Sequence, residues 1–375
     1  RHVPYEIANA EHLAMSDSVG MINLSHFAIM DIKGPDTERM LEYLSVAKVG
    51  GETAEGKIIY TNFLDEDGGV HADLTIARLG PDSYRVITGG ADGNRDWVTL
   101  RNYRDDMGLD AEINIRTHDI STLGLWGPQA KEALGHFVDP SEISIENFPF
   151  VTTKNLTLNL SGGKKVDVWA ARISYVGESG WEIYLNNDSE EGLALYDSLL
   201  EVGVVPVGIE TYANSRRLEK SFRLQGADLE TEYNACESAV ERPKVKADDF
   251  HGKTAHLAHR EEEPSAILCT MTLDDLTVSG SGSRYPVGIS PIIDPDTGEV
   301  PVDSKGRRSY STSMSYCPSL QKHVVMGYLP KNIAVSGKSL ELHYFNENGD
   351  GIYPMTVQIV GKGSLYDPKN ERVRS

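Results

Sequence analysis

The chain changes character at the acidic run Glu261-Glu262-Glu263-Pro264, and this change limits what it can fold into. Helix-like and strand-like patterns alternate before the run, whereas Gly, Ser and Pro become frequent after it and helix signals become scarce. Short strand-like runs then recur at residues 266–273, 323–329, 339–345 and 352–359, a pattern typical of a small β-barrel or sandwich. A chain of 375 residues is also too long for one hydrophobic core. We therefore predict a region of mixed helices and strands over residues 1–263 and a small β-barrel or sandwich over residues 264–375.

Residues 57–90 have the pattern of a β-meander, with strands at 58–64, 70–79 and 84–88 and turn residues between them. In the middle strand, apolar residues alternate with polar ones, which predicts that Asp73 lies on the face opposite the core. Further along, the sequence predicts strands between residues 156 and 185. Helices are predicted at 97–107, 129–137, 192–202 and 212–224.

The charge of the chain narrows the classes of ligand it is expected to bind. With 36 Lys and Arg against 56 Asp and Glu, the formal net charge is −20. Such a surface repels phosphate backbones, so we expect no nucleic-acid binding, and an anionic ligand would need a local cluster of arginines.

Three cysteines without a C-x-x-C pair favour reduced thiols and a cytoplasmic location. The first residues do not resemble a leader and the longest apolar stretch is interrupted, so we expect no membrane association.

The segment ARISYVGESGWEIYL, residues 171–185, has two strand-like runs around Gly177-Glu178-Ser179-Gly180. If these four residues form a hairpin loop, Tyr175 lies directly opposite Glu182, with Cβ atoms roughly 5 Å apart. A phenol and a carboxylate on one face of a sheet suit a ligand with several N–H donors. From the pattern alone, a surface hairpin with an incidental Tyr–Glu pair is the simpler interpretation.

Asp73 stands inside a predicted strand, where aspartate is disfavoured unless something compensates. The simplest interpretation is a solvated residue on the outer face of the sheet. The alternative is a hydrogen-bond acceptor or base in a cleft, close to Tyr60 of the preceding strand.

The segment NSRRLEKSFR, residues 214–223, is the densest basic cluster in the acidic part of the chain. On a helix, a solvated ionic stripe would contain Arg216, Glu219, Lys220 and Arg223, with Glu219 and Arg223 as a favourable pair. Arg217 lies off this stripe, where it could reach inward. Because the planar guanidinium suits carboxylate recognition, the cluster is a candidate site for an anionic ligand. A solvated helix face explains Arg216 and Arg223 well and Arg217 less well.

No metal site is predicted. The run from Asp294 to Glu299 resembles the start of a calcium loop, but Gly298 and Lys305 stand where ligands are needed, so we interpret it as a turn. His251, His256 and His259 lack nearby Cys or carboxylate partners at zinc spacing.

Eight segments, in this order along the chain, resemble the tetrahydrofolate-binding aminomethyltransferase family, whose founder is the glycine-cleavage T-protein. They are GPDTERML (34–41), GGVHADLTI (68–76), LGLWGPQAKEAL (123–134), ISYVGESGWEIYL (173–185), RRLEKSFRLQGADL (216–229), DFHGK (249–253), MGYLP (326–330) and LYDPKNERVR (365–374). The chain is most similar to the folate-binding C-terminal halves of dimethylglycine and sarcosine dehydrogenases. The resemblance implies a three-lobed cloverleaf, with two α+β lobes within residues 1–263, a central folate channel and a C-terminal small β-barrel.

The resemblance also implies roles for individual residues. Asp73 matches the family's catalytic aspartate, and Tyr60 matches a tyrosine thirteen residues before it that lines the pocket. Tyr175 and Glu182 match the pair that contacts the folate. We expect Arg217 to meet the glutamate tail of the folate, with Arg216 as the second choice.

The function implied by the resemblance is tetrahydrofolate-dependent one-carbon transfer, that of a methyltransferase, aminomethyltransferase or demethylase. The donor would be a small methylated amine or sulfonium compound. Ala72 stands where T-proteins usually have a second Asp, which favours the dehydrogenase-associated branch and weakens a role with a lipoyl carrier. We expect neither flavin nor metal in this chain.

Two other functions stay open. The chain could be a partner subunit that captures formaldehyde or an iminium from a separate flavin oxidase. It could also be a non-catalytic folate-binding module, although such relatives share a K-G-C-Y-x-G-Q-E-type motif that is absent here.

Overall fold

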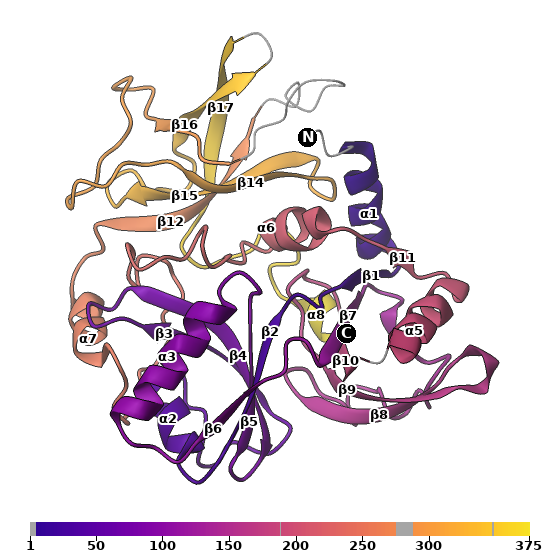
Figure 1. Cartoon of the computed structure of the whole chain (residues 1–375). Helices are drawn as coiled ribbons and strands as arrows, with labels where there is room; N and C mark the ends of the chain where they lie inside the picture. Colours follow the sequence, from indigo (N-terminus) through magenta and orange to yellow (C-terminus); the bar gives the residue numbers. More distant parts are fainter. Residues whose placement is uncertain (1–4, 188, 275–287, 347–348) are drawn as a thin grey trace.

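The computed structural model describes residues 5–187, 189–274, 288–346 and 349–375. Three sheets form three lobes around a common centre (Figure 1). The three-lobed α+β fold predicted from the sequence is confirmed. Among the described residues, no helix is both long and apolar enough to cross a membrane.

The first lobe has a five-stranded sheet that contains the predicted meander. Its strands, in spatial order, are β3 (Ile58–Leu64), β4 (Val70–Gly80), β5 (Ser83–Thr88), β2 (Ala28–Lys33) and β6 (Glu112–Ile115). Helices α2 (Thr37–Leu44) and α3 (Gly93–Asp106) pack on it, and their apolar side chains join those of the strands in one core. The alternation in β4 explains this packing, since Ala72, Leu74 and Ile76 are all buried in that core.

The second lobe has a six-stranded sheet. Its order is β11 (Val205–Pro206), β1 (Gly20–Asn23), β7 (Ile120–Trp126), β10 (Gly180–Asn186), β9 (Lys165–Ala171) and β8 (Thr153–Asn159). Helices α4 (Ala130–Leu134) and α5 (Ser189–Glu201) contribute to its core, and a 3-10 turn, η1 (Ser161–Gly163), joins β8 to β9. Helix α1 (Tyr5–Asp17) lies beside β1 and β11.

The third lobe is the C-terminal barrel. Its order is β13 (Ile292–Ile293), β16 (Ser339–Asn346), β17 (Gly349–Val360), β12 (Ala266–Leu273), β15 (Lys322–Pro330) and β14 (Ser311–Cys317). The sheet curls until its two ends meet at a bridge between Pro291 and Tyr310. The four strands predicted after residue 263 are all present. Residue 263 itself lies between α7 (Lys253–Glu261) and β12, and the division into domains there stays a prediction.

The helix predicted over residues 212–224 is only partly correct. The chain forms a π-helix, η2 (Glu210–Arg216), followed by the short α6 (Arg217–Glu219), at the centre of the three lobes (Figure 1). Ser221 has a φ of 54°, which ends the helix and turns the chain away from it. The predicted pairing of Glu219 with Arg223 along a helix is therefore wrong.

The predicted four-residue hairpin is also wrong. Strand β9 ends at Ala171, which pairs with Glu182, so the connection spans residues 172–179. This connection leaves the sheet because its backbone is bound elsewhere. Trp126 Nε1 donates to the carbonyl of Ile173 at 2.8 Å, and Arg216 Nε donates to that of Val176 at 3.2 Å. Tyr175 consequently does not lie opposite Glu182.

Candidate active site

Asp73 lies on β4 directly opposite Asn62 of the antiparallel strand β3. Asn62 Nδ2 donates a hydrogen bond of 2.9 Å to Asp73 Oδ1. Tyr60 is two residues from Asn62, so the two side chains share one face of the sheet. The neighbouring side chain of Ala72 is buried in the core on the opposite face. Asp73, Asn62 and Tyr60 therefore form a polar group on the face away from this core.

Burial raises the pKa of the Asp73 carboxyl to about 7, although hydrogen bonding to Tyr60 and Asn62 and the charge of Arg223 act in the opposite direction. Burial, and then the charge of Asp73, raise the pKa of the Tyr60 hydroxyl well above its ordinary value. Yet 46% of Tyr60 is accessible to solvent. Tyr60 therefore packs beside Asp73 while nearly half of its surface stays open to a ligand.

Tyr175 lies in the connection 172–179, close to this group. Its hydroxyl donates a hydrogen bond of 2.7 Å to the backbone carbonyl of Arg223. Its ring stacks on Phe222, with centroids 6.0 Å apart, and meets the ring of Tyr212 at 5.3 Å. The side chain is partly exposed. Burial raises the pKa of its hydroxyl; the charge of Arg217 is the largest charge effect and lowers it, and Asp228, Asp73 and Arg223 act more weakly.

Glu182 lies on the central strand β10 and is 4% exposed. It accepts a hydrogen bond from the hydroxyl of Tyr184, two residues along the same strand. Burial raises the pKa of Glu182 to about 7, against the effect of this hydrogen bond. In the described part of the chain, Glu182 forms no ion pair with a Lys, Arg or His. Burial, and then the charge of Glu182, raise the pKa of the Tyr212 hydroxyl, and the Tyr212 ring packs on that of Tyr175.

Arg217 does not reach this group. The side chain is fully buried, and it reaches inward as the sequence suggested. Its guanidinium pairs with Asp228 at 2.5 Å and donates to Ser313 Oγ at 2.6 Å and to the carbonyl of Ala213 at 2.7 Å. These contacts join the central helix to the barrel. The structure therefore gives Arg217 a structural position and does not expose it to a ligand carboxylate.

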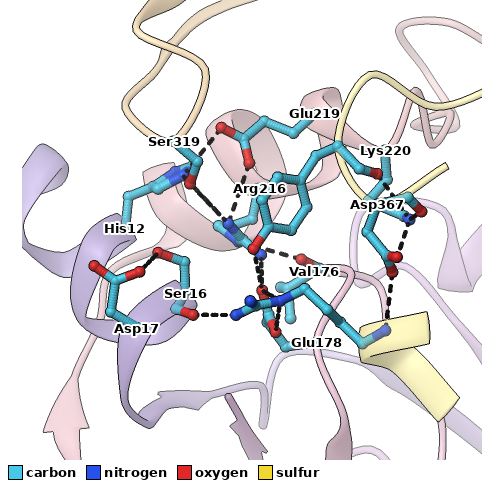
Figure 2. Close-up of polar contacts among 12 residues, drawn as sticks. His12, Ser16, Asp17, Val176, Glu178, Arg216, Glu219, Lys220, Ser319 and Asp367 are labelled. Carbon is cyan, nitrogen blue, oxygen red and sulfur yellow. Dashed lines mark hydrogen bonds and ion pairs between the residues drawn. The ribbon is translucent and has the colours of Figure 1, made fainter. Parts of the chain in front are cut away.

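Arg216, the second choice, is also fully buried (Figure 2). It pairs with Glu178 and with Glu219, the latter at 3.1 Å. Lys220 is equally enclosed, and its Nζ donates to the carbonyls of Tyr366 and Asp367 at 3.0 and 2.7 Å. The expected solvated ionic face is thus wrong for Arg216, Glu219 and Lys220, because helix α1, the connection 172–179, the barrel and residues 365–375 enclose them.

The sequence prediction missed three residues that the structure places at the group. Asn62 could have been found from its register opposite Asp73 in the predicted meander. Tyr212 had no signal, because its place depends on the π-helix. Arg223 was assigned to the solvated stripe, whereas it is partly exposed beside Asp73 and Tyr175.

Two cavities have linings that exclude Asp73 and Glu182, although Tyr184, the donor to Glu182, lines the second. One, of about 570 Å³, is lined by residues that include Glu38, Tyr43 and Tyr103. The other, of about 460 Å³, is lined by residues that include Arg85, Trp169 and Tyr184. Asp73 lines neither cavity, and we regard the grouping of perturbed carboxyls and tyrosines as better evidence for a site than cavity size.

The acidic run near Asp294 forms a turn, as predicted, with Thr297 and Gly298 donating to the Asp294 carbonyl. Lys338 Nζ lies 3.0 Å from Asp294 and 2.6 Å from Asp296. Within residues 5–187, 189–274, 288–346 and 349–375, no three His, Cys, Asp or Glu side chains are grouped so that they could hold a metal.

The raised pKa of Asp73 predicts a pH-dependent effect on stability. Between its ordinary value of 3.8 and about 7, the folded chain binds more protons than the unfolded chain. The contribution of Asp73 to stability therefore falls as the pH rises through this window. The free energy of unfolding of Asp73→Asn, taken relative to that of the wild type, should therefore increase by about 1–3 kcal/mol from pH 5 to pH 8. Denaturant unfolding at both pH values measures the gain, and a difference independent of pH would contradict it.

Comparison with known proteins identifies the class to which this fold belongs. The structure matches the crystal structure of glycine cleavage system aminomethyltransferase T from Bartonella henselae with a TM-score of 0.74 and 21% identity, over 94% of this chain and 88% of that one. The model of the GCVT N-terminal domain matches residues 2–245.

Two relatives indicate the range of the family. Mitochondrial dimethylglycine dehydrogenase of Rattus norvegicus is 30% identical over 359 residues, which is 93% of this chain and 38% of the relative. The aminomethyltransferase of Symbiobacterium thermophilum is 27% identical over 347 residues, 91% of this chain and 86% of the relative. The chain thus spans 38% of the length of the dimethylglycine dehydrogenases it matches.

This chain belongs to the aminomethyltransferase family defined by the GCVT domain. The family predicted from the eight sequence segments is confirmed. The roles of single residues, the donor and the partners are proposals, which follow.

Proposed function

We propose that this chain transfers a one-carbon unit from a small N-methyl or sulfonium compound to tetrahydrofolate, forming methyl-tetrahydrofolate by direct transfer, or methylene-tetrahydrofolate where a flavin oxidase has first oxidised the N-methyl compound. The observation that carries the proposal is a pair of carboxyls in an aminomethyltransferase fold, the partly exposed Asp73 bound to Asn62 and the buried Glu182 bound to Tyr184, each with a pKa raised to about 7. Carboxyls perturbed in this way, inside an aminomethyltransferase fold, are strong candidates for catalytic and ligand-binding groups.

The residues suit the chemistry of tetrahydrofolate. Its N5 is a modest nucleophile, and its pterin ring carries several N–H donors. Glu182 is a buried acceptor for such donors. Asp73, when ionised, accepts hydrogen bonds from the pterin and stabilises positive charge that develops at N5.

In direct methyl transfer, N5 forms a bond to the methyl carbon, the donor's C–N or C–S bond breaks, and its electron pair leaves with the donor heteroatom. The proton lost from N5 passes to Asp73 or to water. Alignment of the donor carbon with N5 supplies much of the rate.

A second candidate is capture of formaldehyde or an iminium released by a flavin oxidase. It is supported by the similarity to proteins named dimethylglycine dehydrogenase, of which this chain spans 38%. Tyr60, Asp73 and Tyr175 would hold the folate in the same way, and only the source of the carbon differs.

Mass spectrometry of the folate product tests the proposal. The protein is incubated with tetrahydrofolate and one donor at a time, without and with a flavin amine oxidase. Methyl-tetrahydrofolate from a fully methylated onium donor without oxidase is the result expected for direct transfer. Methylene-tetrahydrofolate only when the oxidase is present, at a rate above that without this protein, supports capture. Folate binding without product in either arm would make the chain a non-catalytic module and contradict the proposal.

A further inference from the structure

Arg223 is held rigidly by backbone carbonyls from three parts of the chain. Its Nη1 donates to Ser221 at 2.7 Å, its Nε to Ser238 at 3.2 Å and its Nη2 to Gly361 at 2.9 Å. The positive φ of Ser221 brings the side chain to this place. A guanidinium has five N–H groups, so one on each terminal nitrogen is left for another acceptor.

No carboxylate in the described residues lies within ion-pair distance of Arg223, in contrast to the neighbouring Arg216 and Arg217. The acidic groups that act on it from further away are already paired, Asp228 with Arg217 and Glu241 with Lys362. A partly enclosed charge without a counter-charge loses some of its hydration, and an anionic ligand would offset this loss.

Arg223 lies near Asp73, because its charge is among those that act on the Asp73 carboxyl. The Tyr175 hydroxyl is bound to its carbonyl, and the segment that follows Ser238 leads to Arg242, whose Nη1 donates to the Tyr60 carbonyl at 2.9 Å. Arg223 is itself partly exposed. A fixed cation and the carboxyl of Asp73 thus lie close enough to influence each other, with Tyr60 and Tyr175 beside them.

We propose that Arg223 is the carboxylate-binding residue of this site. The inference rests on the proposed function and deepens it, because it assigns the anion-binding role to Arg223. A carboxylate fits the two remaining N–H groups on a planar guanidinium. This carboxylate belongs either to the donor, as in an N-methylated amino acid, or to the glutamate tail of the folate.

The test uses Arg223→Met, which removes the charge and keeps most of the length, and Arg223→Lys, which keeps the charge without the planar fork. Arg39→Met is the matched control, because Arg39 is an exposed residue on α2. Circular dichroism and thermal unfolding establish that each variant is folded. If Arg223→Met does not fold, the comparison is made with Arg223→Lys alone.

Two pairs of ligands distinguish the sources of the carboxylate. Calorimetry compares tetrahydrofolate with a tetrahydropterin that lacks the aminobenzoyl-glutamate tail. Transfer assays without oxidase compare KM for N,N,N-trimethylglycine with KM for choline, two fully methylated onium donors of which only the first carries a carboxylate.

In the wild type we expect the carboxylated member of one pair to be favoured, and Arg223→Met to reduce that preference about 10–100-fold. Arg223→Lys should reduce it less, and Arg39→Met should leave it unchanged. Loss of preference in the folate pair assigns the carboxylate to the tail, and loss in the donor pair assigns it to the donor.

Unchanged preferences in a folded Arg223→Met would overturn the inference while the proposed function stands. A wild type that prefers neither carboxylated ligand would also overturn it. If the wild type binds no folate at all, the proposed function fails as well.

Discussion

Replacing Asp73 by Ala is expected to lower the rate of one-carbon transfer about 10²–10⁴-fold at saturating tetrahydrofolate. The reason is that Asp73 is the carboxyl with a raised pKa on the face shared by Tyr60 and Asn62. Folate affinity should change only a few-fold, since Glu182 and the tyrosines remain. Single-turnover rates, with the dissociation constant measured separately, give the two quantities.

The matched control is Asn62→Ala, which removes the amide bound to Asp73 and leaves the carboxyl in place. We expect its rate to fall far less than that of Asp73→Ala. The wild-type rate should rise with pH through about 7 as Asp73 ionises. Full activity of Asp73→Ala would remove Asp73 from the mechanism.

Replacing Arg217 by Ala is expected to destabilise the fold by about 3–5 kcal/mol, because Asp228 would be left buried without its cation. The side chain also joins the central helix to Ser313 of the barrel, and that contact would be lost. Denaturant unfolding measures the loss. Folate affinity, measured below the onset of unfolding, should stay near that of the wild type.

The double variant Arg217→Met with Asp228→Leu tests whether the unpaired charge of Asp228 causes the loss of stability. Removing both charges leaves no unpaired ion, so this variant should recover much of the stability lost in Arg217→Ala. Selective loss of folate affinity in a stable Arg217→Ala protein would instead restore the ligand role first expected of Arg217.

Much of the fold was predictable because it depends on local periodicity. The alternation around Asp73 predicted a strand and its buried face, and the structure has both. The barrel strands were predicted for the same reason. The connection between β9 and β10 could not be predicted in this way, because hydrogen bonds from the side chains of Trp126 and Arg216 hold it away from the sheet.

The site shows the same division. Asp73, Tyr60, Tyr175 and Glu182 were predicted from matching segments, and their roles stay predictions; the structure places Tyr60 on the same sheet face as Asp73, and Tyr212 against Tyr175. Their electrostatic states could not be predicted, because burial by residues distant in the sequence raises the pKa of both carboxyls.

The sequence by itself determined the family, the strand pattern and the candidate carboxyls, since short segments and local alternation encode these. Only the tertiary structure decided which arginine is neutralised and which is not. With a net charge of −20, the chain has many carboxylates with which an arginine can pair. Arg216 and Arg217 have such partners inside the fold, whereas Arg223 is held by carbonyls and keeps its charge for a ligand. Pairing depends on which side chains the three lobes bring within a few ångströms, and spacing along one helix does not contain that information.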